Sequence, residues 1–276
     1  MTPSGAWSTA EGAASWQASA AQRQQTMAET TELLLSAAGV APDARVLDIG
    51  AGTGDVALVV ARRVGRIGAV LAADVSASML EVAARLAREA GLTNVSTRAV
   101  RAEDLDLPEA SFDAAVARNS FMFVTDLPRA LRAVRKALRR GGRLAASVWG
   151  PAERNPYHGV PVAVVRRRGA IPTPIPEVVQ AFSLSDGETL AAAMREAGFG
   201  EVQIRRANAG RSFPSLEDAL RAAREFPTFV ALLAGLSEDG REAVWDEIAA
   251  EWRRFVKDGA LHLPGEQLVV SGENRG

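Results

Sequence analysis

Three glycines at alternate positions, directly after a short apolar run, constrain this chain more than any other feature. Residues 45–55 read R-V-L-D-I-G-A-G-T-G-D. The run predicts a strand, and Gly50, Gly52 and Gly54 predict a turn with positive φ that lets a ligand approach the backbone. The segment D-V-A-L-V-V-A-R-R-V that follows predicts a helix whose N-terminal amides point back at this turn. A strand, a glycine turn and a helix in this order predict a cofactor site.

The charges around the turn favour one class of cofactor over another. A dinucleotide fold has the pattern G-x-G-x-x-G, in which a pyrophosphate rests on the helix N-terminus. Here Asp55 stands where the third such glycine is expected, and Asp48 lies two residues before the first glycine. At an effective dielectric of ~20, two like charges ~4 Å apart cost about 4 kcal/mol. The carboxylates therefore disfavour a phosphate and favour a cationic cofactor such as S-adenosylmethionine.

With these residues the chain resembles the class I S-adenosylmethionine-dependent methyltransferases, whose first motif has the form hydrophobic-hydrophobic-D-h-G-x-G-x-G. The resemblance covers about residues 44–149 and is strongest to the methyltransferases of ubiquinone and menaquinone biosynthesis and their small-molecule relatives. It implies an α/β, Rossmann-like, doubly wound fold with a mostly parallel seven-stranded sheet in the order 3-2-1-4-5-7-6 and helices on both faces. It also implies S-adenosyl-L-methionine as cofactor and S-adenosyl-L-homocysteine as product. The motif residues are Val46, Leu47, Asp48, Ile49, Gly50, Gly52 and Gly54.

Composition limits the partners. With 32 basic and 33 acidic residues among 276, the net charge of -1 gives no general electrostatic reason to bind nucleic acid or anionic membranes. A small-molecule acceptor fits better. The absence of cysteine excludes disulfides and thiol nucleophiles, and because His158 and His262 have no second histidine nearby, we expect no metal site.

The chain divides into three expected parts. Residues 1–40 form an N-terminal helical cap segment, residues 41–150 the cofactor-binding core, and residues 151–276 complete the sheet and add a helical cap over the acceptor site. No apolar run reaches the ~20 residues of a membrane helix, and the N-terminus lacks a signal pattern, so we expect a cytoplasmic protein without a membrane span. We expect a monomer or a homodimer.

Further cofactor-binding residues follow the next two predicted strands. Asp74 ends the strand over residues 69–74, 24 residues after Gly50, close to the ~20-residue spacing at which a carboxylate meets ribose hydroxyls. Ser76 is a predicted N-cap, and Met79 is either the adenine contact that the resemblance implies or a core residue. The expected set is Asp48, Gly50, Ala51, Gly52, Gly54, Asp74, Val75, Ser76, Met79, Ala102, Glu103 and Arg118.

The turn after the third strand, residues 95–100, departs from the family pattern. The family usually has Asp or Asn followed by Ala, whereas this chain has Arg101 followed by Ala102. The side chain that binds the adenine amino group is therefore open between Glu103 and Asp104, and Ala102 can still offer its backbone amide.

The acceptor pocket is expected where the fourth strand, residues 112–117, ends at the sheet's carboxyl edge. The resemblance implies that Arg118 touches the methionine part of the cofactor through its backbone. The candidate pocket residues are Trp16, Asn119, Phe121, Met122 and Phe123. Two alternatives remain: the apolar residues 121–123 are the buried start of the next helix, and Trp7 and Trp16 merely pin the terminus to the core.

The remaining elements follow from periodicity and from the resemblance. An amphipathic helix over residues 126–140 ends at Gly141-Gly142, and residues 143–149 form the fifth strand. A loop and a short helix then cover the sheet edge, residues 201–206 form the sixth strand, and residues 215–255 are mostly helical. The last strand, residues 266–272, is expected to insert antiparallel between the fifth and the sixth.

The chemistry expected of this family needs no protein nucleophile, because the sulfonium methyl is already an activated electrophile. Positioning an acceptor atom for in-line displacement can contribute about 7–11 kcal/mol. If the acceptor is a phenol or quinol, a base would help. His158 is the candidate, with Tyr157 second, and the alternative is a surface histidine without a role.

The sequence thus predicts an S-adenosylmethionine-dependent methyltransferase that acts on an oxygen or carbon atom of a small apolar or aromatic acceptor. One alternative keeps the cofactor but makes RNA or protein the acceptor. Another is a nucleotide-binding α/β domain without methyl transfer.

Overall fold

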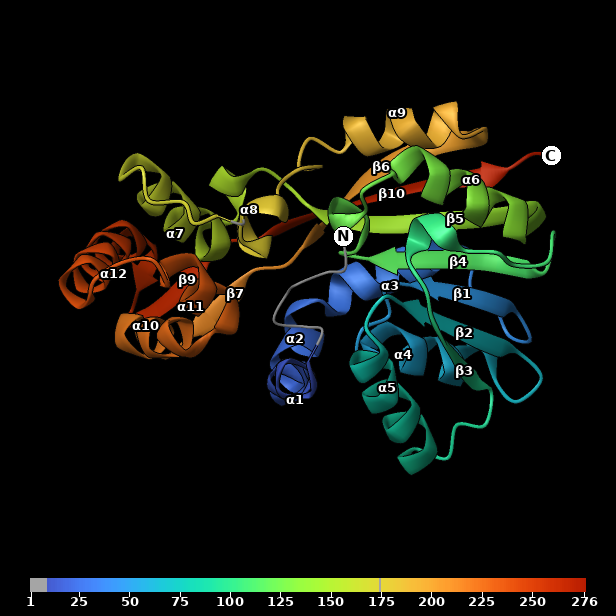
Figure 1. The fold of residues 1–276 in the computed structure, drawn as a ribbon, viewed down its shortest axis with the longest axis horizontal. Helices are drawn as coiled ribbons and strands as arrows, with labels where there is room; N and C mark the ends of the chain where they lie inside the picture. Colours follow the sequence, from blue (N-terminus) through green and yellow to red (C-terminus); the bar gives the residue numbers. More distant parts are fainter. Residues whose placement is uncertain (1–8, 174) are drawn as a thin grey trace.

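The computed structural model describes residues 9–173 and 175–276, so the predicted role of Trp7 lies outside the described residues. A seven-stranded sheet in the order β3-β2-β1-β4-β5-β10-β6 forms its centre (Figure 1). The first five strands run parallel, and β10 is antiparallel to both β5 and β6. The strands are β1 (Arg45–Ile49), β2 (Ala69–Asp74), β3 (Val95–Ala99), β4 (Phe112–Arg118), β5 (Leu138–Trp149), β6 (Phe199–Asn208) and β10 (Glu266–Asn274). The predicted order is confirmed, with β10 as the seventh strand.

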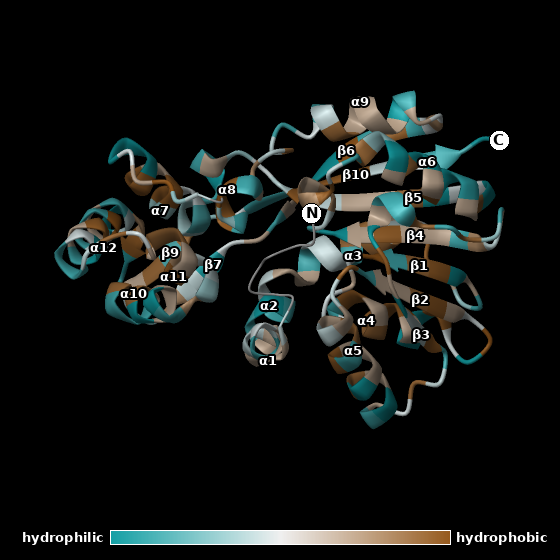
Figure 2. Ribbon diagram, viewed as in Figure 1, coloured by the Kyte–Doolittle hydropathy of each residue, from teal (hydrophilic) through white to brown (hydrophobic). Residues whose placement is uncertain are grey.

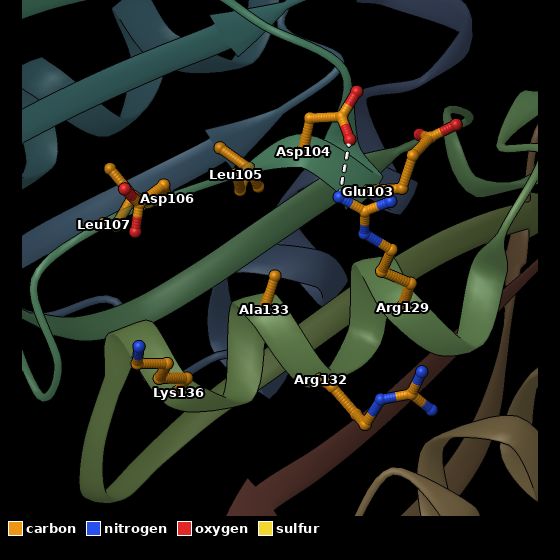
Figure 3. Close-up of a pocket in the computed structure, with 9 residues that line it drawn as sticks. All are labelled: Glu103, Asp104, Leu105, Asp106, Leu107, Arg129, Arg132, Ala133 and Lys136. Atoms are coloured by element: carbon orange, nitrogen blue, oxygen red, sulfur yellow. Dashed lines mark ion pairs between the residues drawn. The ribbon is translucent and has the colours of Figure 1, made fainter.

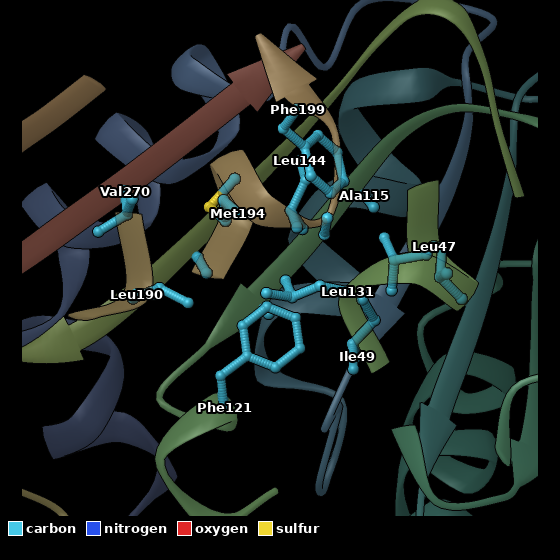
Figure 4. Close-up of a cluster of buried hydrophobic side chains, with 14 of the residues drawn as sticks. Leu47, Ile49, Ala115, Phe121, Leu131, Leu144, Leu190, Met194, Phe199 and Val270 are labelled. Atoms are coloured by element: carbon cyan, nitrogen blue, oxygen red, sulfur yellow. The ribbon is translucent and has the colours of Figure 1, made fainter. Parts of the chain in front are cut away.

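Helices cover both faces of this sheet, and each face has its own hydrophobic core. Leu47 and Ile49 of β1 pack on one side and Val46 on the other, because successive side chains of a strand alternate between faces. One face carries α3 (Ala28–Ala37), α4 (Asp55–Val64) and α5 (Ala77–Glu89); the other carries α6 (Leu127–Ala137) and α9 (Glu188–Glu196). Figure 4 shows the α6 and α9 side, where Leu131, Leu190, Met194 and Phe199 belong to one hydrophobic cluster. Covered on both faces, β1 reads as a nearly continuous apolar run.

The fifth strand begins earlier than predicted. The helix ends at Ala137, and β5 starts at Leu138 instead of after Gly142. Leu138 pairs with Phe112 and Arg143 with Ala114, so the register shifts between these pairs. Gly141 has a φ of 80°, which lets the chain bulge and keep pairing with β4 where we predicted a helix end.

A second unit with its own core stands at the carboxyl edge of the sheet (Figure 1). It comprises α7 (Pro156–Arg167), α8 (Glu177–Gln180), α10 (Leu216–Glu225), α11 (Pro227–Leu233), α12 (Glu238–Trp252) and a three-stranded sheet of β7 (Arg211–Phe213), β9 (Ala260–Leu263) and β8 (Val256–Lys257). We call it the helical unit. Its helices were predicted, whereas its small sheet was not. Figure 2 shows hydrophobic residues in the strands of the large sheet and hydrophilic residues on the outward faces of the helices.

Two short helices precede α3 within the N-terminal helical segment. They are α1 (Ala10–Ala18) and α2 (Ala20–Thr26), which breaks at Ser19 and Met27 separate from each other and from α3. Ser78 of α5 donates a hydrogen bond to the Thr9 carbonyl, 3.3 Å away, which ties the start of α1 to the core. Among the described residues, no helix is long and apolar enough to cross a membrane.

Candidate functional site

The glycine turn has the positive φ angles that the sequence predicts. Gly50, Gly52 and Gly54 have φ values of 68°, 55° and 88°. The amide of Gly50 donates to the Ala73 carbonyl at 2.8 Å, which holds the turn against the end of β2. A Cβ atom on Gly50 would lie 2.3 Å from the Cβ of Ser120, so only glycine fits there.

Asp74 faces this turn. Its Oδ2 accepts a hydrogen bond from the Gly52 amide at 2.9 Å, and its Oδ1 accepts one from the Ser76 amide at 2.8 Å. Burial raises the pKa of the Asp74 carboxyl, and the amides of Ser76 and Gly52 partly offset that shift. Ser76 caps α5 by accepting from the Met79 amide, as predicted. After β2, Val75 is partly exposed to solvent, whereas Met79 is buried.

Asp48 is buried beneath the turn, and its Oδ2 has no hydrogen-bond partner among the described residues. Burial raises the pKa of this carboxyl to about 7; Arg118 and the Ala57 amide lower it, and Asp74 and Asp55 raise it further. A buried carboxylate without a partner is costly unless a ligand supplies one. The position therefore suits a cationic ligand group.

Two arginines also reach the turn, so the charge around it is not purely negative, as the sequence had suggested. Arg118 donates to Asp55 Oδ2 at 3.1 Å and to Thr31 Oγ1 at 3.0 Å, and Arg23 of α2 donates to the same Asp55 oxygen at 2.9 Å. The side chain of Arg118 thus turns toward α3 and α4. Asp55 shares its charge between two guanidinium groups, so the site offers cations as well as carboxylates. Such a mixture matches a ligand end that carries both signs of charge.

Trp16 lies on the glycine turn. Its indole nitrogen is 3.9 Å from where a Cβ on Gly52 would stand. The Arg23 guanidinium lies 4.1 Å from the Trp16 ring centroid and donates to the Trp16 carbonyl at 2.5 Å. Helices α1 and α2 therefore lie over this end of the sheet edge, and Trp16 contacts both the glycine turn and Arg23.

The predicted adenine turn forms the short helix η2 (Ala102–Asp104), and its carboxylates have partners. Glu103 is buried and paired with Arg101, whereas Asp104 pairs with Arg129 of α6 at 2.9 Å (Figure 3). Behind the turn, a pocket of about 330 Å³ lies between residues 103–107 and α6 and is lined by charges of both signs. Asp104 therefore points to α6, which leaves Glu103 and the Ala102 backbone as the adenine candidates.

The residues after β4 divide between core and site. Phe121 and Met122 are buried in the core beneath α6 and α9, so these two are the covered start of the next segment and not pocket residues (Figure 4). The reason is the turn of η3 (Phe121–Phe123), which directs them to the α6 face. Phe123 is half-buried at its margin. Asn119, with a φ of 55°, accepts a hydrogen bond from Ser147 Oγ at 3.3 Å and stays at the sheet edge.

At the other end of the edge, aromatic rings of the helical unit meet the sheet. The rings of Trp149, the last residue of β5, and His158 of α7 are 4.9 Å apart, and His158 lies 5.8 Å from Phe229. Burial and, secondarily, Arg211 hold the pKa of His158 well below its usual value. Tyr157 stacks on Trp252 at 5.5 Å and on Phe213 at 5.9 Å in the core of the unit, where burial raises its pKa.

Comparisons with known proteins identify this arrangement. The model of a methyltransferase domain family matches residues 46–142, from β1 into the start of β5. The ubiquinone/menaquinone biosynthesis C-methyltransferase UbiE of Proteus mirabilis is 33% identical over 178 residues, which are 61% of this chain and 71% of that protein. The chain belongs to the class I S-adenosylmethionine-dependent methyltransferases. It is accordingly an enzyme with S-adenosylmethionine as cofactor, as the motif predicted.

Solved structures show the same fold for this methyltransferase. The YcgJ protein from Bacillus subtilis superposes with a TM-score of 0.57 at 22% identity, over 89% of this chain and 98% of that one. A putative methyltransferase from Bacillus halodurans gives a TM-score of 0.59 at 18% identity, over 89% and 99%. At such identities the likeness concerns the fold alone.

Sequence reasoning missed two residues that the structure brings to this edge of the sheet, Arg23 beside Asp55 and Trp149 beside His158. Asn155 was also missed. Its side chain accepts from the Glu266 amide at 2.9 Å and donates to the Gly150 carbonyl at 3.1 Å, so it ties the end of β5 to the start of β10. No local motif marks these positions, because their partners come from other elements.

Proposed function

We propose that this methyltransferase moves a methyl group to an oxygen or carbon atom of a small aromatic or apolar acceptor bound at the carboxyl end of β5 and the amino end of β10. The observation that carries this proposal is the contact of the Trp149 ring with His158, whose ring also lies beside Phe229, near the Arg118 end of β4. Aromatic walls with few polar groups are typical of small-molecule pockets. The C-methyltransferase relative acts in ubiquinone and menaquinone biosynthesis, which fits an acceptor of this class.

The residues around the glycine turn fit the cofactor, and we propose a role for each. Asp74 would accept from the ribose hydroxyls, since its two oxygens already accept from two amides. Asp48, whose Oδ2 has no partner within residues 9–173 and 175–276, would face the α-ammonium group. Arg23, whose buried Nη2 likewise lacks a partner in that part of the chain, would bind the carboxylate together with Arg118. Met79 and the Ala102 backbone would contact the adenine.

We assign the catalytic contribution of the chain mainly to positioning. When bound, S-adenosylmethionine supplies a methyl group already activated by the sulfonium. His158 stays neutral because burial lowers its pKa, so it can accept or donate a hydrogen bond but is a weak base. Tyr157 packs inside the helical unit and holds His158 from one side, with ring centroids 4.9 Å apart. An acceptor held behind the methyl in a water-poor site gains about 7–11 kcal/mol from orientation.

We propose the same three-part division that the sequence suggested. Residues 1–40 would cover the cofactor through Trp16 and Arg23, residues 41–150 would hold it, and residues 151–276 would complete the sheet and cap the acceptor. The contacts of α2 with Asp55 and of α7 with Trp149 support this division.

The test combines binding with turnover. Calorimetry with S-adenosylhomocysteine should show saturable binding, and radiolabelled S-adenosylmethionine should label members of a panel of phenols, catechols and hydroquinones. Labelling of total RNA or of protein with no labelled small molecule would contradict the acceptor class. Absence of S-adenosylhomocysteine binding at millimolar concentration would contradict the cofactor roles given above.

A further inference from the structure

Polar groups without partners gather where the sheet joins the helical unit. Gln267, in β10, is fully buried, and neither its Nε2 nor its Oε1 has a hydrogen-bond partner among the described residues. The Nε2 of His158 is also buried and unpaired within that part of the chain. Buried polar groups in folded proteins are nearly always hydrogen-bonded, so each orphan calls for a missing partner. Three such atoms in one place indicate that a bound ligand supplies their hydrogen-bond partners.

The strand register brings these orphans together. Gln267 stands directly opposite Trp149 in the antiparallel pair of β10 and β5, and opposite residues share one face of a sheet. The Trp149 ring is 4.9 Å from the His158 ring. Gln267 and His158 therefore flank the same indole.

The same face connects this place to the cofactor end. Ser147, two residues before Trp149, pairs with Arg118 in the parallel register of β5 and β4. Arg118 in turn donates to Asp55 beside the glycine turn. A molecule that touches Trp149 and Gln267 is thus one strand away from the arginine that borders the cofactor.

A cation completes the group. The guanidinium carbon of Arg211, in β7, lies 4.4 Å from the ring centroid of Tyr157, and the Tyr157 and His158 rings are 4.9 Å apart. Arg211 is half-buried, and no carboxylate of the described residues pairs with it. Burial lowers its pKa, and the nearby positive charge of Arg23 lowers it as well. The nearest acid along β10, Glu266, is already paired with Arg154 at 2.6 Å and with Arg206 at 3.3 Å.

Together the three side chains offer more donors than acceptors. A guanidinium donates only, an amide group donates two hydrogens and accepts at one oxygen, and a neutral imidazole donates one hydrogen and accepts at its other nitrogen. A planar oxyanion matches a guanidinium fork and the surplus of donors. The ring of such a ligand would rest on Trp149.

We propose that the acceptor carries an oxyanion next to a planar ring, a carboxylate or a phenolate, and that Arg211, Gln267 and His158 bind this oxyanion. The assignment rests on the proposed function of this edge as the acceptor site. It defines the acceptor as an acidic aromatic molecule, and this substrate class is narrower than the small aromatic or apolar molecules proposed above. Arg211 selects by charge, whereas Gln267 and His158 orient the bound oxygen atoms.

The experiment compares matched probes on the enzyme saturated with S-adenosylhomocysteine at pH 8.5. Benzoate and benzamide share a shape and differ in charge, as do 4-nitrophenolate and 4-nitrotoluene. Calorimetry should show at least one anion binding about tenfold or more tightly than its neutral partner, the usual size of a charge-assisted contact. A preference for benzoate indicates that the site recognises a carboxylate, and a preference for 4-nitrophenolate indicates that it recognises a phenolate.

Substitutions then locate the preference. Arg211→Gln should abolish it, Arg211→Lys should retain part of it, and Gln267→Leu should weaken the preferred anion several-fold. Arg205→Gln, a change of an exposed arginine in β6, is the matched control and should leave it unchanged. Unaltered affinity for S-adenosylhomocysteine shows that a variant is folded. If Arg211→Gln does not fold, Arg211→Lys is used in its place.

Two results would overturn the inference. One is that neither anion binds more tightly than its neutral partner; the other is that the preference persists in both Arg211 variants. Either result leaves the cofactor roles intact if S-adenosylhomocysteine still binds. Loss of that binding in the unmodified enzyme would instead count against the proposed function.

Discussion

The two ends of the sheet's carboxyl edge are built differently. At the β1 and β2 end, the groups are backbone amides and carboxylates from residues 48–55 and 74–76, held by a turn that needs glycine. At the β5 and β10 end, the groups are rings and polar atoms contributed by Trp149, His158, Arg211 and Gln267. The first end depends on backbone shape, and the second on how the helical unit packs against the sheet. A change at one end should therefore leave the other end working.

The largest expected effect comes from a substitution that tests whether the helical unit can be destabilised without changing cofactor binding. Trp252→Ala removes a fully buried ring and the 3.0 Å hydrogen bond from its indole to the Pro156 carbonyl. We expect a loss of about 3–5 kcal/mol in the free energy of unfolding, with affinity for S-adenosylhomocysteine kept within about twofold, since no cofactor contact changes. Denaturant titration and calorimetry measure the two quantities. Ile67→Ala, at an exposed position, is the control, and a parallel loss of cofactor binding would show that the two ends are coupled.

The next prediction tests the buried carboxyl under the glycine turn. Because the pKa of Asp48 is about 7 in the folded protein and 3.8 as its ordinary value, the folded state holds this proton more tightly, and stability falls as the pH rises from about 4 to about 7. A shift of about three units corresponds to about 4 kcal/mol. Asp48→Asn should therefore stabilise the protein by up to about 4 kcal/mol at pH 8 and hardly at all at pH 4. The same variant should bind S-adenosylmethionine more weakly.

Thermal unfolding of both proteins across pH 4–8 measures this difference. The groups that surround Asp48 are Arg118, Asp74 and Asp55, and all of them stay in place in the variant. A stabilisation that is equal at pH 4 and pH 8 would contradict the assignment of the shift to Asp48.

A pair of glycine substitutions isolates the close approach at the turn. Gly50 and Gly91 both have a φ of 68°, but a Cβ on Gly50 would lie 2.3 Å from the Ser120 Cβ, while a Cβ on Gly91 would have no described atom within 4 Å. Gly91→Ala should cost about 1–2 kcal/mol of stability from the backbone alone. Gly50→Ala should cost about 1–3 kcal/mol more, because of the overlap, and should also weaken cofactor binding. Equal costs for the two variants would show that the turn relaxes around the methyl group.

The smallest effect concerns the carboxylate at the end of β2. Asp74→Asn keeps one oxygen acceptor and removes the charge, which should lower affinity for S-adenosylhomocysteine by about 10- to 100-fold, the range for a hydrogen bond to a charged group. Affinity for the acceptor probes should stay the same. Asp106→Asn, an exposed change after β3, is the control. An Asp74 variant that binds the cofactor normally would remove this residue from the site.

The fold was predictable where a local pattern decides it. The apolar runs, the glycine turn and the cap at Ser76 each depend on a few adjacent residues, and the structure reproduces them. The start of β5 was not predictable, since Gly141-Gly142 fits a helix end as well as a bulge, and pairing with Phe112 decides between them. Phe121 and Met122 show the same limit: their hydrophobicity suits a pocket or a core, and only packing under α6 and α9 distinguishes the two.

The sequence by itself determined the glycine turn of this enzyme and the carboxylates beside it, because the conformational freedom of glycine and the charge of aspartate act within a span of about ten residues. Only the tertiary structure decided which arginines join that turn and which groups form the proposed acceptor end. Arg23 and Arg118 become neighbours of Asp55, and Gln267 a neighbour of Trp149, through sheet order and helix packing. Partners that lie 30 to 120 residues apart in a chain leave no periodic or local mark, so the charge balance and the orphaned polar atoms of the site emerge only when the chain is folded.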